Sequence, residues 1–124
     1  MKILVVDDES DVRSLFEQRF RKEIRDGNMI FAFAYSGEEA LEYLKKLDHE
    51  AVLILSDINM PGMSGFVLLK HIKEQFKNPP PVVMMITAFG DDESYSQAMR
   101  LGADDFLTKP LNFLHLREKL KTTQ

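Results

Sequence analysis

Short apolar runs alternate with segments of helical periodicity along the whole 124-residue chain. The runs predict strands at residues 3–6, 29–34, 51–56, 82–86 and 103–107. The segments between and after them predict helices over about 10–26, from 37, from 64, over 91–101 and over 111–121. Regular strand–helix alternation is typical of an α/β fold, so we expect a five-stranded parallel sheet with helices on both faces.

Length and composition place the chain among single-domain globular proteins, and we expect one domain over 1–124. The sequence contains no cysteine, which excludes disulfides and thiolate metal sites and fits a reducing compartment. It has no stretch of membrane-spanning length and no secretory signal, so we expect no membrane association and a cytoplasmic location. A net charge of −4 argues against direct nucleic-acid binding.

Polar residues follow four of the apolar runs at the point where each strand should end. Asp7 and Asp8 follow the first run, and Asp57 follows the third. Thr87 follows the fourth run and Lys109 follows the fifth. Because ligands of such sheets bind outside the carboxyl ends of the strands, we expect these side chains to converge there.

The three carboxylates of this edge need a counter-charge. Two like charges about 4 Å apart repel by roughly 4 kcal/mol at an effective dielectric near 20. Mg²⁺ would relieve the repulsion, because it prefers oxygen ligands and binds one or two carboxylates together with phosphate oxygens. Taken singly, Asp7 and Asp8 are also explained by the dipole at a helix start, and Asp57 by a turn.

Asp57 has the chemistry of a nucleophile towards phosphorus, since a carboxylate can form an aspartyl phosphate. Lys109 and a metal would neutralise charge on the transferring group, and Thr87 would contact one of its oxygens. Each residue also has a simpler explanation, because a threonine at a strand end and a surface lysine are both common.

Four segments together resemble the receiver domains of two-component response regulators over the whole length of the chain. The segments are VVDDE at 5–9, SDINMPGMSG at 56–65, ITA at 86–88 and LGADDFLTKP at 101–110. The resemblance implies a flavodoxin-like, doubly wound (βα)5 fold with strand order 2-1-3-4-5. It also implies that the chain is no enzyme beyond catalysing its own phosphorylation and dephosphorylation.

The resemblance implies a role for each acidic position. Asp57 would accept a phosphoryl group from a phosphohistidine of a sensor histidine kinase or a phosphotransfer protein. Asp8, Asp57 and the backbone carbonyl of Asn59 would bind Mg²⁺, with Asp7 acting mainly through water.

The resemblance also assigns the phosphoryl oxygens to Thr87, Lys109 and the backbone N–H of Ala88. The small side chain of Ala88 would leave Asp57 accessible. The peptide bond between Lys109 and Pro110 would be cis and would direct the lysine inward.

Switching in this family couples Thr87 to an aromatic residue, here Phe106. Phosphorylation would change a surface made by the helix at 91–101, the strand at 103–107 and the helix at 111–121. That surface would bind a downstream effector or output domain, or a second copy in a homodimer. Phe106 as a static core residue, and the last helix as simply core-facing, remain alternatives.

Three other classes of protein deserve comparison. An aspartate-nucleophile phosphatase of the haloacid dehalogenase type needs an acid two residues after Asp57, where the chain has Asn59. A flavodoxin-like nucleotide binder needs a phosphate-cradling loop where this chain has Asp7 and Asp8. A receiver-like module without phosphorylation would not need Asp8, Asp57, Thr87 and Lys109 together. The sequence leaves open whether the chain stands alone or is a fragment of a longer regulator, and which kinase serves it.

Overall fold

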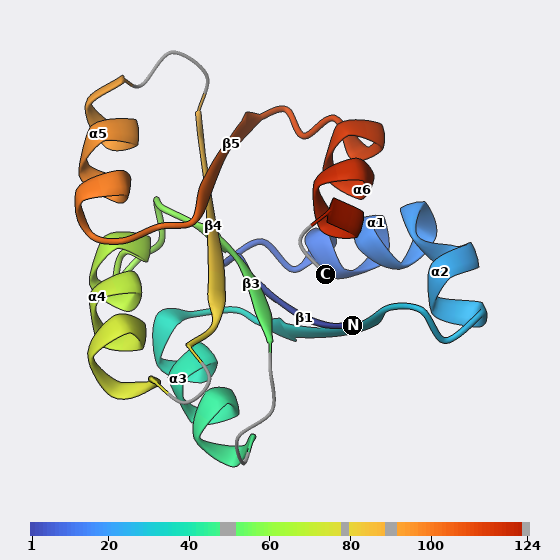
Figure 1. The fold of residues 1–124 in the computed structure, drawn as a ribbon, viewed down its shortest axis with the longest axis horizontal. Coiled ribbons are helices and arrows are strands. Elements are labelled where there is room, and N and C mark those ends of the chain that lie inside the picture. The colour runs from blue at the N-terminus through green and yellow to red at the C-terminus, as the bar shows by residue number, and fades with distance from the viewer. Residues whose placement is uncertain (48–51, 78–79, 89–91, 123–124) are drawn as a thin grey trace.

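The computed structural model describes residues 1–47, 52–77, 80–88 and 92–122 (Figure 1). The strands are β1 (Lys2–Val6), β2 (Ile30–Ala34), β3 (Leu53–Asp57), β4 (Val82–Ala88) and β5 (Asp105–Lys109). The helices are α1 (Asp11–Arg19), α2 (Arg21–Arg25), α3 (Gly37–Lys46), α4 (Gly65–Gln75), α5 (Asp92–Arg100) and α6 (Phe113–Thr122). Within these residues no helix has the length and apolarity needed to cross a membrane.

The sheet confirms the predicted architecture. Its five strands are parallel in the order β2-β1-β3-β4-β5. Helices α1, α2 and α6 lie on one side of it, and α3, α4 and α5 lie on the other (Figure 1). Five strands that all point the same way place all their carboxyl ends at one edge of the sheet, as the sequence predicts.

The central strands form the core because both of their faces are covered. Residues of β1 alternate between the two sides: Ile3 and Val5 pack in the cluster under α1 and α6, and Leu4 and Val6 pack in the cluster under α3 and α4. Full burial of an aliphatic side chain contributes about 1.5–3 kcal/mol. Uninterrupted apolar runs, without polar alternation, are the expected signature of strands covered on both faces.

The prediction of a single helix over about 10–26 is wrong, because the structure has two helices there, α1 and α2. The chain bends at Phe20, whose backbone angles are φ −111° and ψ 24°. The guanidinium of Arg117 donates to the carbonyl oxygen of Arg19 at 2.7 Å, at the last residue of α1. Ile24, which the sequence pattern places on the buried stripe, is 37% exposed on α2. A contact from α6 therefore accompanies the break that local periodicity does not reveal.

The last strand lies two residues later than predicted. The structure places it at Asp105–Lys109, whereas the sequence predicts 103–107. Ala103 and Asp104 precede the strand and make other contacts. The Ala103 N–H donates to the Ala98 carbonyl at 3.0 Å. An Asp104 carboxylate oxygen accepts from the Val83 N–H at 2.8 Å. The fourth strand also extends beyond its predicted end, to Ala88. The start of the third predicted strand, residue 51, lies outside the described residues.

Candidate functional site

The predicted site residues meet at the carboxyl edge of the sheet. Asp57 ends β3, Lys109 ends β5, and Thr87 is the penultimate residue of β4. Asp7 follows β1 directly, and its N–H donates to the Ala34 carbonyl of β2 at 3.1 Å. The register pairs Ala88 with Lys109, so β4 and β5 end level with each other. The edge is thus assembled by strands that are neighbours in the sheet and distant in sequence.

Asp57 is a buried carboxylate with a contact at each oxygen. The side-chain ammonium of Lys109 lies 2.9 Å from Oδ2. The backbone N–H of Asn59 donates to Oδ1 over 3.4 Å. Burial alone lowers the pKa of Lys109, but the hydrogen bond and negative charge of Asp57 outweigh it and raise that pKa. Lys109 therefore keeps its positive charge at neutral pH, where it lies against the buried carboxylate of Asp57.

Three carboxylates come together beside this pair. Asp7, Asp8 and Asp57 each offer an oxygen, and the three oxygens lie within 4.8 Å of one another. Burial raises the pKa of Asp7, a hydrogen bond from the Glu9 N–H at 3.0 Å opposes the rise, and the charge of Asp57 adds to it. The cluster has the oxygen donors and the excess negative charge that suit a hard divalent cation.

Thr87 carries a buried hydroxyl without a hydrogen-bond partner among the residues that the structure describes. Its side chain is 0% exposed, and its Oγ1 atom has no donor or acceptor within reach there. An unsatisfied buried hydroxyl is costly, by about 1–3 kcal/mol. The hydroxyl lies near the ends of β3 and β5 and could donate a hydrogen bond to an oxygen-rich group bound at this edge.

Gly65 packs closely against the backbone of Asp57 and Ile58, a role not predicted from the sequence. It begins α4, and its N–H donates to the Ile58 carbonyl at 2.8 Å. A Cβ at this position would lie 2.7 Å from the Ile58 Cα and would also clash with the Asp57 carbonyl oxygen. The residue belongs to the 56–65 segment, so the motif contains the signal, but only the packing reveals its reason.

For the remaining predicted residues, the structure gives the position in the fold and leaves the predicted role untested. Asn59 is exposed just beyond β3, and Ala88 is the last residue of β4. The Lys109–Pro110 peptide bond is cis, as predicted. The metal-binding role of Asn59 and the phosphate-binding role of Ala88 stay predictions.

Phe106, the predicted switch residue, is half-buried in β5 and packs against the core cluster beneath α3, α4 and α5. The ring of Tyr95 on α5 meets it edge-on, with 5.2 Å between ring centroids and an interplanar angle of 89°. Tyr95 is itself 49% exposed. No pattern in the sequence indicates this pair, which joins α5 to β5.

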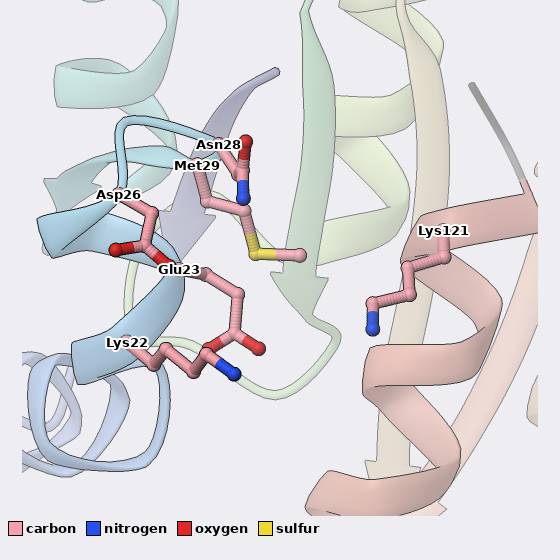
Figure 2. Close-up of a pocket in the computed structure, with 6 residues that line it drawn as sticks. All are labelled: Lys22, Glu23, Asp26, Asn28, Met29 and Lys121. Carbon is pink, nitrogen blue, oxygen red and sulfur yellow. The ribbon is translucent and has the colours of Figure 1, made fainter.

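A separate hollow of about 340 Å³ lies near the amino-terminal end of β2 (Figure 2). Its lining residues are Lys22, Glu23, Asp26, Asn28, Met29 and Lys121. Burial raises the pKa of Glu23, but a backbone hydrogen bond and the charge of Arg117, 2.9 Å away, outweigh it and lower that pKa. This hollow contains none of the predicted site residues.

Comparison with known proteins agrees with the geometry of the carboxyl edge. The family model described as the response regulator receiver domain matches residues 3–121. Regulatory protein VanRc of Enterococcus gallinarum is 37% identical over 98% of this chain, which covers 48% of that protein. A cyclic di-GMP phosphodiesterase of Thermotoga maritima is 36% identical over 97% of this chain and 30% of its own length. The chain thus spans half or less of these two relatives.

Solved structures show the same fold. The chemotaxis response regulator CheY4 of Vibrio cholerae matches with a TM-score of 0.78 and 30% identity, over 99% of this chain and 98% of that one. Receiver domains bind Mg²⁺ at an acidic pocket and interact with histidine kinases and output domains, and the cluster of Asp7, Asp8 and Asp57 could hold such a metal. On its sequence, its fold and the residues at this edge, the chain belongs to the response regulator receiver domain family.

Proposed function

We propose that Asp57 is the phosphoacceptor of a two-component switch. The observation that carries the proposal is the Asp57–Lys109 pair, held next to two further carboxylates at one edge of the sheet. An Asp57 oxygen would attack the phosphorus of a phosphohistidine on a sensor kinase or phosphotransfer protein. The new O–P bond replaces the N–P bond, whose electron pair returns to the imidazole nitrogen. The chain catalyses this transfer and the later hydrolysis on itself, and acts on no other substrate.

The other residues would stabilise the charge that moves to Asp57. Lys109 already lies at Oδ2 and would exchange part of that contact for a phosphoryl oxygen. The buried Thr87 hydroxyl would donate to a second phosphoryl oxygen and so gain the partner it lacks. The backbone N–H of Ala88 would hold a third.

Mg²⁺ would be bound by Asp8, Asp57 and the carbonyl of Asn59, with Asp7 acting through water. When bound, it would offset the negative charge of the acidic cluster and of the incoming phosphoryl group. Burial and the charge of Asp57 raise the pKa of Asp7, so ionisation of this carboxylate costs more than in water, and a cation bound at the cluster would offset that cost.

We further propose that the switch is read through Thr87 and Phe106. As Thr87 moves towards the phosphoryl group, it would leave space for the half-buried Phe106 ring to turn inward. The edge-on contact with Tyr95 would then change, and with it the surface of α5, β5 and α6. An effector, an output domain or a second copy would bind there by apolar contact, because Phe106 has no hydroxyl to offer.

Intact-mass measurement tests the proposal directly. The wild-type chain is incubated with acetyl phosphate, with Mg²⁺ or with a chelator, and we expect the mass of one phosphoryl group only with Mg²⁺. Asp57→Asn should take up none, whereas Asp11→Asn, an exposed aspartate in the first turn of α1, should behave as wild type. Equal uptake by Asp57→Asn would place the reaction elsewhere.

A further inference from the structure

Strand β2 is an edge strand with two residues whose outward backbone groups are unpaired within the described chain. In the parallel register with β1, the Ile30 N–H donates to the Met1 carbonyl and the Ala34 carbonyl accepts from the Asp7 N–H. Ile30, Ala32 and Ala34 therefore direct their backbone groups towards β1. Phe31 and Phe33 direct theirs away from the sheet.

The two ends of this edge are already closed by the chain itself. The Met29 N–H donates to the Glu23 carbonyl at 3.2 Å. The Tyr35 N–H donates to the Glu39 carboxylate at 3.3 Å. The open part of the edge is thus a short window with two outward-facing residues, Phe31 and Phe33.

The window lacks the features by which edge strands usually avoid pairing. The sequence Ile-Phe-Ala-Phe-Ala contains no charged residue and no proline. Ile30 is 56% exposed, and the three residues after it are half-buried. An uncharged, β-prone edge with free donors and acceptors favours the addition of another strand.

We propose that this window pairs antiparallel with the same window of a second copy of the chain. A two-fold axis at Ala32 would place Phe31 of each copy opposite Phe33 of the other, and each such pair would exchange two N–H···O bonds. This register uses both open residues and neither of the closed ones. It also places Ile30 opposite Ala34 of the second copy, a large side chain facing a small one.

Charge complementarity favours a second copy over another partner. The chain enters β2 from α2, which carries Arg21, Lys22 and Arg25, and leaves it into α3, which begins with Glu38 and Glu39. Figure 1 shows α2 and α3 at opposite ends of this strand. Antiparallel pairing would therefore bring the basic end of each copy towards the acidic end of the other. The dimer should be weakened by salt.

Single cysteines test the register, because the chain has no native cysteine. Ala32→Cys would face its own copy across the axis at a Cα separation of about 4.5 Å, within the range for a disulfide. Ile30→Cys would lie about 14 Å from its copy, too far to bond. We expect Ala32→Cys to form disulfide-linked dimers under mild oxidation at least about tenfold faster than Ile30→Cys.

Ile30→Cys is a stringent control, because Ile30 is more exposed than Ala32. Random collision between molecules would therefore cross-link Ile30→Cys faster than Ala32→Cys. Cross-linking of Ile30→Cys as fast as Ala32→Cys, or of neither while both remain folded by circular dichroism, would overturn the proposal.

Sedimentation of chains without cysteine gives a second and independent measurement. We expect the weight-average mass of the wild type to rise above 14.3 kDa with concentration. Ile30→Lys should abolish the rise, because it places a charge on the edge. Leu114→Lys, an equally drastic change at a 65% exposed position of α6, should retain it. The reverse result would assign self-association to the α6 surface, and a wild type that stays monomeric would exclude the second copy as occupant.

Discussion

The ammonium nitrogen of Lys109 lies 2.9 Å from a carboxylate oxygen of Asp57, and the two side chains differ sharply in exposure, 39% against 6%. The carboxylate is buried and depends on its partner, whereas the lysine reaches it from the solvent side. Substitution of Lys109 leaves the buried carboxylate without its partner and so makes two effects measurable: the cost of an unpaired buried anion and the loss of charge stabilisation during the proposed transfer.

Lys109→Met should slow phosphorylation by acetyl phosphate by about 100-fold, since loss of one preorganised donor typically has an effect of that size. It should also lower the free energy of unfolding by about 1–2 kcal/mol, less than for a fully buried pair because the lysine is partly exposed. Stopped-flow phosphorylation and urea unfolding give the two quantities. Lys109→Arg, which keeps the charge, should recover most of the stability, and a stability loss equal to that of Lys109→Met would count against an electrostatic role.

The same pair has a defined pH dependence. The pKa of Lys109 is raised above its ordinary value of 10.5, so folding favours the protonated form. The contribution of the pair should be complete at neutral pH and should disappear only as pH rises above about 10.5 through the raised pKa. The difference in free energy of unfolding between wild type and Lys109→Met, measured between pH 7 and 11, should therefore shrink only at the alkaline end.

Asp7→Asn should stabilise the chelator-treated protein at neutral pH. Folding raises the pKa of Asp7 above its ordinary value of 3.8, so the native state holds this proton more tightly than the unfolded state. Stability should therefore fall as pH rises from about 3.8 through the raised pKa, and the substitution should remove that loss. Thermal melts in a chelator should show a higher melting temperature for Asp7→Asn at pH 7 and no difference near pH 3.

Mg²⁺ should reverse the order of the melting temperatures of the wild type and Asp7→Asn. A cation that binds only the folded acidic cluster adds about 1.4 kcal/mol of stability for each tenfold excess over its dissociation constant. The wild type should gain melting temperature in millimolar Mg²⁺, and Asp7→Asn or Asp8→Asn should gain less. An equal gain in all three chains, or in Asp57→Asn, would place the cation outside the cluster.

Thr87→Val should raise the stability of the unphosphorylated chain and shorten the lifetime of the phosphorylated one. The substitution removes a buried hydroxyl that has no partner among the described residues, which should raise the free energy of unfolding by about 1 kcal/mol. It should also remove a donor to the phosphoryl group and shift the response of Phe106. Urea unfolding gives the first quantity, and the lifetime of the phosphorylated chain by intact mass gives the second. Thr87→Ser should behave as wild type in the phosphorylated state.

Gly65→Ala should destabilise the fold by about 1–3 kcal/mol, because the added Cβ overlaps the backbone of Asp57 and Ile58. Relief of the overlap requires the backbone of Asp57 to move, so phosphorylation should also slow. Val67→Ala, at an exposed position two residues further along α4, is the control and should change stability by less than about 0.5 kcal/mol. Unchanged stability in Gly65→Ala would show that the loop behind Asp57 adapts freely.

The central strands were predictable because a strand that is buried on both faces appears in the sequence as a continuous apolar run. The runs around Ile3 and Ile54 are apolar at successive positions, and both lie in the interior of the sheet. The break at Phe20 was not predictable in the same way. Phe16, Phe20 and Ile24 keep helical spacing across it, and the contact that marks the break comes from Arg117, nearly a hundred residues later. Long-range contacts of this kind leave no local pattern.

The candidate site was predictable to the extent that strand ends determine it. Asp57 and Lys109 follow apolar runs and meet as expected. Gly65 and Tyr95 were not foreseen, because the first matters through the space its missing side chain leaves and the second through a ring contact between α5 and β5. Steric space and side-chain pairing depend on the assembled structure.

The carboxyl edge draws on residues from position 7 to position 109 of the chain, and the Asp57–Lys109 contact alone spans 52 residues. A nascent chain on the ribosome cannot assemble the edge until its last strand has emerged. Neither a truncated product nor a misfolded intermediate that leaves β5 undocked would hold Asp57 beside its lysine. The reaction proposed at Asp57 would therefore require an assembled sheet, so that only molecules with β5 docked would respond at the full rate.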